Sequence, residues 1–151
     1  MIDTRPTPRT LDRKLVLLVV ALLMAMASVV SFATPAQAAT ATLVGNQGMN
    51  TVMHYNTART NSNGQNFVSF RATSVGNSGG YVVIGLRNSS GTQFASGPST
   101  GFGQTGTIRN SGLNYVTAGT FYINARWVGA CGGCNPGRWE GVLTYNVRYV
   151  P

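Results

Sequence analysis

Residues 139–149 read WEGVLTYNVRY, and this stretch does most to decide the fold. Its odd-numbered positions are apolar or small, and its even-numbered positions are mostly polar. Because successive side chains of a β-strand point to opposite faces, this alternation predicts a strand with one buried face. Residues 121–127, FYINARW, also place their apolar residues at the odd numbers. We therefore expect two half-buried strands near the C-terminus.

These two strands are expected to pair as an antiparallel hairpin. In the expected register Trp127 lies opposite Trp139, and Arg126 lies opposite Glu140 on the other face. Side chains of similar size and of opposite charge then face each other, which favours this register.

The tip of the expected hairpin is the sequence CGGC at residues 131–134. A redox site of this spacing needs its first thiol at a helix N-terminus, and no helix is expected here. A structural zinc needs four ligands, and beside the two thiols the segment after residue 38 offers only His54. A structural disulfide between Cys131 and Cys134 is therefore the preferred interpretation, with redox and metal sites as alternatives.

Further alternating segments are separated by turns rich in glycine, asparagine and serine. We expect strands at residues 41–45, 51–58, 67–75, 81–87, 92–95 and 105–109, which with the two above make about eight. Residues 61–65 and 97–104 are expected loops, and residues 88–91 are an expected turn with Gly91 in the left-handed conformation. No window after residue 38 has helical spacing. The sequence thus predicts one all-β domain, an antiparallel β-sandwich of jelly-roll-like type.

Residues 1–38 have the order of a secretory signal. A basic segment at residues 5–14 precedes an apolar segment at residues 15–33, and AQA at residues 36–38 is a typical cleavage site. The apolar segment is long for a signal, so an uncleaved membrane anchor is the alternative. We expect cleavage before Ala39, a β-sandwich domain at residues 39–151, a secreted, extracellular location and no stable membrane insertion afterwards.

The charges of residues 39–151 are one-sided. They include no lysine and no aspartate, and seven arginines against Glu140 give a formal charge of +6. Such a balance favours anionic partners, namely another secreted protein or an anionic cell-surface polymer. Nucleic acid is not expected, because the chain is secreted and has no clustered basic run. Arginine in place of lysine, with abundant alanine and glycine, suggests an actinobacterial chain.

The same residues lack the groups that common hydrolytic sites need. His54 is the only histidine, and Glu140 is the only side-chain carboxylate. A catalytic triad needs a base and a group that orients it, and glycosidase chemistry needs two carboxylates. We expect no enzyme activity, no cofactor and no metal site.

The candidate binding residues lie on the polar faces of the two C-terminal strands. They are Tyr122, Asn124, Arg126, Asn146 and Arg148. The alternative is that this face is ordinary solvated surface.

Residues 83–92, VIGLRNSSGT, and residues 116–123, VTAGTFYI, resemble the pre-peptidase C-terminal jelly-roll modules of secreted bacterial peptidases. The resemblance implies a jelly-roll fold. The acidic turn residues that could hold calcium in such modules are Asn88 and Ser89 here, so we expect no calcium.

Together these observations lead us to expect a secreted, non-enzymatic binding or adaptor protein. It would be a small subunit of an extracellular assembly, such as an antibacterial toxin particle. The alternatives are a lectin-like module for cell wall or carbohydrate, and an inhibitor of an extracellular enzyme.

Overall fold

The fold is known from a computed structural model, which describes residues 37–75, 80–129 and 137–151. These residues form seven strands and no helix: β1 (Ala39–Gln47), β2 (Val52–Val75), β3 (Gly80–Arg87), β4 (Gln93–Ser96), β5 (Thr105–Asn110), β6 (Val116–Gly129) and β7 (Gly137–Arg148). All pairings between them are antiparallel. The predicted all-β, antiparallel class is therefore confirmed. Nothing among the described residues is a helix that could span a membrane.

Two of the sequence predictions fall outside the described residues. The expected signal segment lies there except for Gln37 and Ala38, and so do Cys131 and Cys134 with their expected disulfide.

The strands form one sheet that closes on itself. Hydrogen-bonded neighbours follow the order β1-β7-β2-β5-β4-β3-β6, and β2 also pairs with β6. This second pairing closes β2, β5, β4, β3 and β6 into a five-strand barrel. β7 and β1 continue the sheet outward from β2. The finer assignment to a sandwich or jelly roll stays a prediction.

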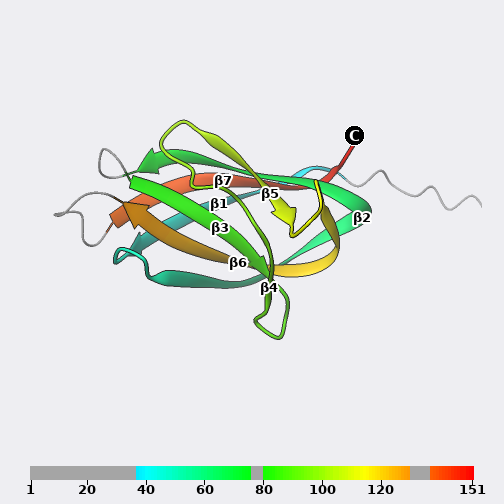
Figure 1. The fold of residues 1–151 in the computed structure, drawn as a ribbon, viewed down its shortest axis with the longest axis horizontal. Coiled ribbons are helices and arrows are strands. Elements are labelled where there is room, and N and C mark those ends of the chain that lie inside the picture. The colour runs from blue at the N-terminus through cyan, green and yellow to red at the C-terminus, as the bar shows by residue number, and fades with distance from the viewer. Residues whose placement is uncertain (1–36, 76–79, 130–136) are drawn as a thin grey trace, which may run out of the picture. The chain divides into compact units, whose positions relative to one another are not determined.

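The longest strand, β2, belongs both to the barrel and to the part of the sheet that β7 and β1 form outside it. Its first part pairs with β6, whereas its last part, residues 66–75, pairs with β7. Within that last part, residues 68–71 also pair with β5 on the other edge. Figure 1 shows β2 running along the lower side of the domain, turning at one end and returning along the upper side. The prediction of a loop at residues 61–65 is wrong, because these residues continue the strand. Two expected strands are thus one, which reduces the expected eight to seven.

A set of hydrogen bonds between polar side chains explains why such a polar segment stays in the strand. Asn146 of β7 has a left-handed backbone with φ of 58°, and its amide N–H donates to Asn61 Oδ1 at 2.9 Å. Its side-chain Oδ1 accepts from the Ser62 N–H at 2.7 Å. The buried Asn66 donates from Nδ2 to the Asn63 carbonyl at 2.6 Å. Side-chain amides therefore bond the backbone groups that the bend removes from the ladder.

The core includes apolar side chains that the alternation predicts to face inward in residues 121–127 and 139–149, together with others from β1, β2, β3 and β5. The fully buried side chains include Trp127, Trp139, Phe70, Phe121, Leu43, Ile84, Leu86, Ile108, Ile123, Leu143, Val68 and Val82. The inward direction of both tryptophans is confirmed.

The predicted C-terminal hairpin is wrong. Among the described residues β6 pairs with β2 and β3, and β7 pairs with β1 and β2, so the two strands do not pair with each other. Trp139 lies opposite Gly45 of β1 instead of Trp127. Glu140 forms an ion pair with Arg138 at 3.3 Å and not with Arg126. The observed register suits the large ring, because a Cβ at Gly45 would overlap the Trp139 indole. The glycine on a distant strand supplies the room that the ring needs.

The expected turn after β3 is confirmed. Gly91 has φ of 88°, and the Asn88 N–H donates to the Thr92 carbonyl at 2.9 Å. The Asn88 side chain also accepts from the Thr92 N–H at 2.9 Å, which closes the turn.

Candidate functional site

The outward side chains of three adjacent strands, β2, β6 and β3, form the best-organised polar surface of the domain. We call it the β6 face, and it comprises Val52, His54, Val83, Gly85, Arg87, Tyr122, Asn124 and Arg126. The register sets these residues in rows. Arg126 lies between Val52 and Val83, and Asn124 lies between His54 and Gly85.

Asn124 is the centre of this face. Its side chain is only 8% exposed, and its Oδ1 accepts from Arg87 Nε at 3.0 Å. His54 Nδ1 lies 2.8 Å from the same oxygen. Because arginine only donates, the Asn124 oxygen is an acceptor here and the histidine must carry its proton on Nδ1. The exposed imidazole therefore keeps Nε2 free of this bond, and the Asn124 side chain is held in one orientation.

Arg87 is fixed by three neighbours besides Asn124. Its guanidinium lies 5.0 Å from the centre of the Tyr122 ring, within cation–π range. One of its terminal nitrogens donates weakly to the Tyr55 carbonyl and to Asn56 Oδ1, both at 3.4 Å. Arg87 is thus a structural cation whose hydrogen-bonding capacity is largely used within the fold.

Arg126 differs, because no described residue hydrogen-bonds to its exposed guanidinium. Beside it is a small hollow of about 160 Å³, lined by Val52, Val83, Gly85, Gln93, Asn124 and Arg126. The Gln93 amide lies over Gly85, where a Cβ would meet the end of this side chain. Asn124 Nδ2 makes only a long contact of 3.4 Å to Gln93 Oε1. The hollow therefore offers a free cation and an amide donor with one loose partner, a pair suited to an anionic group.

The structure separates the five predicted binding residues into two groups. Tyr122, Asn124 and Arg126 lie together on the β6 face. Asn146 belongs to the hydrogen bonds at the bend of β2, and Arg148 lines a different hollow. The five residues therefore do not form one continuous surface, because β6 and β7 do not pair with each other in the described part of the chain.

Sequence reasoning missed Arg87 on this face and Gln93 in the hollow beside Arg126. They come from β3 and β4, and only the pairing of β3 with β6 brings Arg87 beside Tyr122. His54 reads as an ordinary surface histidine in the sequence, and no local signal connects it with Asn124. These residues could be grouped only by knowing that β2 and β3 pair with β6, and the sequence does not show this pairing.

The hollow lined by Arg148 lies at the C-terminal end of β7. It measures about 430 Å³ and is lined by Asn63, Gly64, Gln65, Arg148, Tyr149 and Pro151. The Tyr149 ring packs against Tyr115, with centroids 5.8 Å apart, and the Tyr149 N–H donates to the Gln65 carbonyl at 3.0 Å. We call it the C-terminal hollow.

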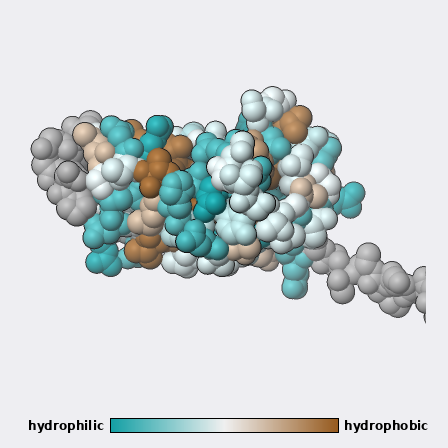
Figure 2. Space-filling model, turned by 90° about the horizontal axis from the view of Figure 1, so that it is seen from below, coloured by the Kyte–Doolittle hydropathy of each residue, from teal (hydrophilic) through white to brown (hydrophobic). Residues whose placement is uncertain are grey.

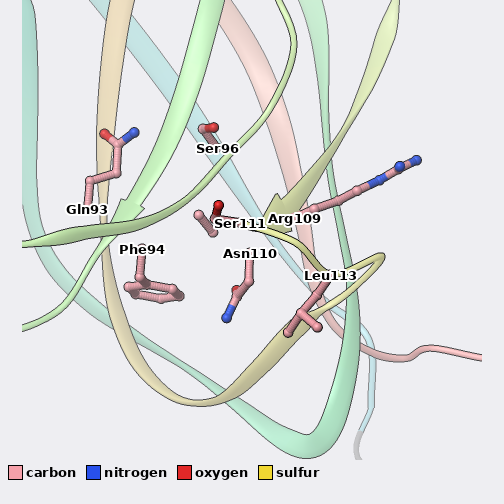
Figure 3. Close-up of a pocket in the computed structure, with 8 residues that line it drawn as sticks. Gln93, Phe94, Ser96, Arg109, Asn110, Ser111 and Leu113 are labelled. Atoms are coloured by element: carbon pink, nitrogen blue, oxygen red, sulfur yellow. The ribbon is translucent and has the colours of Figure 1, made fainter.

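A further hollow of about 440 Å³ lies beside the short pairing of β4 with β5, and Figure 3 shows it in close-up. Phe94, Asn110 and Leu113 surround it, whereas the Arg109 side chain extends away from them (Figure 3). Its polar groups therefore do not converge on one point. The hollow offers apolar contact without a fixed orientation for a ligand.

Apolar residues are scattered over the visible surface. Figure 2 shows them in small separate groups among polar residues on the face that it presents. The described part of the chain also contains no group of three or more histidine, cysteine, aspartate or glutamate residues placed to hold a metal. The β6 face is therefore distinguished by its oriented polar groups, not by apolar area.

Neither a protein-family model nor a curated protein matches this chain. Its function is therefore inferred from the geometry of the surfaces described above.

Proposed function

We propose that the protein is a secreted, non-enzymatic binding or adaptor protein that holds an acidic group of a partner protein against its β6 face. The observation that carries the proposal is the exposed Arg126 guanidinium, which no described residue hydrogen-bonds, beside the oriented amide of Asn124. A carboxylate in this hollow would accept charge-assisted bonds from Arg126 and a further bond from Asn124 Nδ2. The Tyr122 ring and the Asn124 contacts fix the neighbouring Arg87, so little side-chain entropy is lost there on binding.

The charge of the domain supports an acidic partner. Glu140 is the only side-chain carboxylate in residues 39–151, and in the structure it is paired with Arg138. The other six arginines then have no acidic side chain of this domain to meet. Their field attracts an acidic protein surface over a distance and makes association sensitive to salt.

The position of β1 supports secretion by cleavage. β1 begins at Ala39, the residue at which the mature chain is expected to start. Cleavage after Ala38 would leave every described strand intact. The jelly-roll relationship to modules of secreted peptidases remains part of this proposal.

The direct test compares Arg126→Ala with Arg71→Ala. Arg71 is an exposed arginine of β2 outside the β6 face, so both variants lose one charge. Binding to immobilised poly-glutamate, a surrogate for an acidic protein surface, is measured by surface plasmon resonance at low and high salt. We expect Arg126→Ala to weaken binding about tenfold, and Arg71→Ala to change it about twofold or less. Equal losses would show that only net charge matters and would contradict a site at the β6 face.

A second experiment tests the adaptor role. A photocrosslinking residue replaces Val83 on the β6 face, and Thr73, an exposed residue of β2, serves as the matched control position. After irradiation in the native culture medium, a covalent adduct with another secreted protein should form from position 83 and not from position 73. Adducts with polysaccharide alone would contradict the adaptor role.

The C-terminal hollow favours carbohydrate as a second candidate ligand. A tyrosine ring held by a second tyrosine can contact the apolar face of a sugar, and the amides of Asn63 and Gln65 can bond its hydroxyls. Arg148 adds a cation for an acidic sugar. Calorimetric titration with oligogalacturonate and with a neutral oligosaccharide tests this candidate. Tyr149→Ala should abolish the heat of binding, whereas Tyr81→Ala, which removes an exposed tyrosine elsewhere, should not.

A further inference from the structure

β1 has one unpaired edge. Among the described residues it pairs with β7 alone, over all nine of its positions and without a register shift. Its sequence, ATATLVGNQ, contains no charged residue and no proline. Natural proteins protect exposed edges with lysine, proline, bulges or short strands. β1 has none of these protections along its length.

A single hydrogen bond indicates which backbone groups face the free edge. The Tyr55 hydroxyl, which comes from β2, donates to the Val44 carbonyl at 2.7 Å. We take this carbonyl to point away from β7. Because the backbone groups of successive residues point to alternate edges, those of Thr42 and Thr40 then face the same way. The free edge is therefore capped by Tyr55 at Val44 and open toward the start of the strand.

The charge beside this edge is positive. Arg59 follows Tyr55 by four positions on β2. The next part of β2 lies near the start of β1, because Asn146 bonds both Ser62 and the Gln37 carbonyl. Arg59 also lowers the pKa of Tyr55, although burial raises that pKa more strongly. Its guanidinium donates to the Thr57 carbonyl at 2.9 Å. Residues 39–75, which supply β1 and β2, contain no acidic residue. Arg59 therefore lacks an acidic neighbour on these two strands.

We propose that the edge of β1 accepts an extended, acidic segment of a partner protein as an added strand, with a carboxylate of that segment beside Arg59. Backbone hydrogen bonds to Thr40 and Thr42 would supply affinity, and the carboxylate would supply selectivity. A second copy of this chain fits less well. Its own β1 carries no acid, and two domains of formal charge +6 repel each other. This interface is separate from the β6 face.

The test uses a fluorescent peptide of alternating valine and glutamate, with binding followed by anisotropy and by amide hydrogen exchange in NMR. The peptide should slow exchange at Thr40 and Thr42 about tenfold. Thr42→Pro, which removes a donor on the free edge, should weaken binding about tenfold, whereas its control Thr42→Ala should bind as the natural chain does. Thr40→Pro provides a second test if Thr42→Pro fails to fold. Tyr55→Phe frees the Val44 carbonyl and should tighten binding a few-fold.

The outcomes separate this proposal from the previous one. Arg126→Ala should leave the exchange protection at β1 unchanged even if it abolishes binding at the β6 face. Unchanged exchange at Thr40 and Thr42, or full binding by both proline variants, would overturn strand addition. A concentration-dependent dimer that protects the same amides without peptide would assign the edge to a second copy and would also overturn it.

Discussion

Glycines make the room that the two tryptophans occupy. A Cβ at Gly45 would overlap the Trp139 indole, and a Cβ at Gly80 or Gly137 would overlap the Trp127 indole. Each ring therefore lies over bare backbone of a neighbouring segment. The packing of the largest side chains depends on the absence of side chains across from them.

The first prediction tests this dependence. Gly45→Ala should lower the free energy of unfolding by about 1–3 kcal/mol, because the buried ring must shift to admit the methyl group. Gly64→Ala is the matched control, since a Cβ at Gly64 would meet nothing within 4 Å. It should leave stability unchanged or raise it by about 0.4–1 kcal/mol through the unfolded chain. Urea denaturation measures the free energy of unfolding of both variants. Equal changes in the two would contradict the close packing of Trp139 on Gly45.

The second prediction concerns Tyr55 and pH. Burial raises the pKa of its hydroxyl from 10.0 to about 12, and Arg59 partly offsets this rise. Because the folded pKa lies above the unfolded value, the unfolded state releases its proton first. The stability due to this group is thus complete below pH 10 and declines as the pH rises toward 12. The free energy of unfolding of Tyr55→Phe should fall less over this pH range than that of the natural chain, as measured by denaturation at a series of pH values. An equal fall in both proteins would show that the Tyr55 hydroxyl is exposed to solvent.

At the scale of the elements, alternation predicted which residues point inward but not which strands pair. Trp127 and Trp139 are both buried as expected, because alternation is a local property of the chain. Their strands nevertheless pair with others, because pairing depends on complementarity between distant segments, such as Trp139 with Gly45. The same limit applies to the candidate site. Tyr122, Asn124 and Arg126 could be found on one strand, whereas Arg87 could not.

Composition misled the prediction for residues 61–65. Asparagine, serine and glycine usually mark a turn, since their side chains compete for backbone groups. Here side-chain bonds to the backbone stabilise a bent strand instead. Asn61 Oδ1 accepts from the Asn146 N–H, and Asn146 Oδ1 accepts from the Ser62 N–H. A local signal for turn chemistry cannot show whether the chain reverses or continues.

The third prediction tests this bend. Asn146 has a left-handed backbone and bonds Ser62 and Asn61. Asn146→Ala should cost about 1–3 kcal/mol, because it combines backbone strain with lost hydrogen bonds. Asn146→Gly loses the side-chain bonds but accepts the backbone angle, so it should cost less. Thermal denaturation compares the two, and the reverse order would show that the angle is not the constraint.

At the scale of the whole molecule, the fourth prediction concerns processing. Protein recovered from the culture medium should have the intact mass of residues 39–151 with one disulfide between Cys131 and Cys134. Cleavage at this point removes the apolar segment and leaves β1 complete. Mass spectrometry with and without reduction measures both features. Full-length protein found only in the membrane fraction would favour the anchor instead.

If the chain is exported as we propose, the pairing of β1 with β7 has a consequence for the order of folding. The first strand of the domain finds its hydrogen-bonding partner only in the last one, from Ala39 opposite Tyr145 to Gln47 opposite Gly137. Contacts so distant in sequence form slowly and late. A chain that is still emerging through the membrane has β1 outside while β7 is not yet available. During such export the domain could therefore complete its fold only after its C-terminus had crossed, because β7 lies at the C-terminal end of the chain.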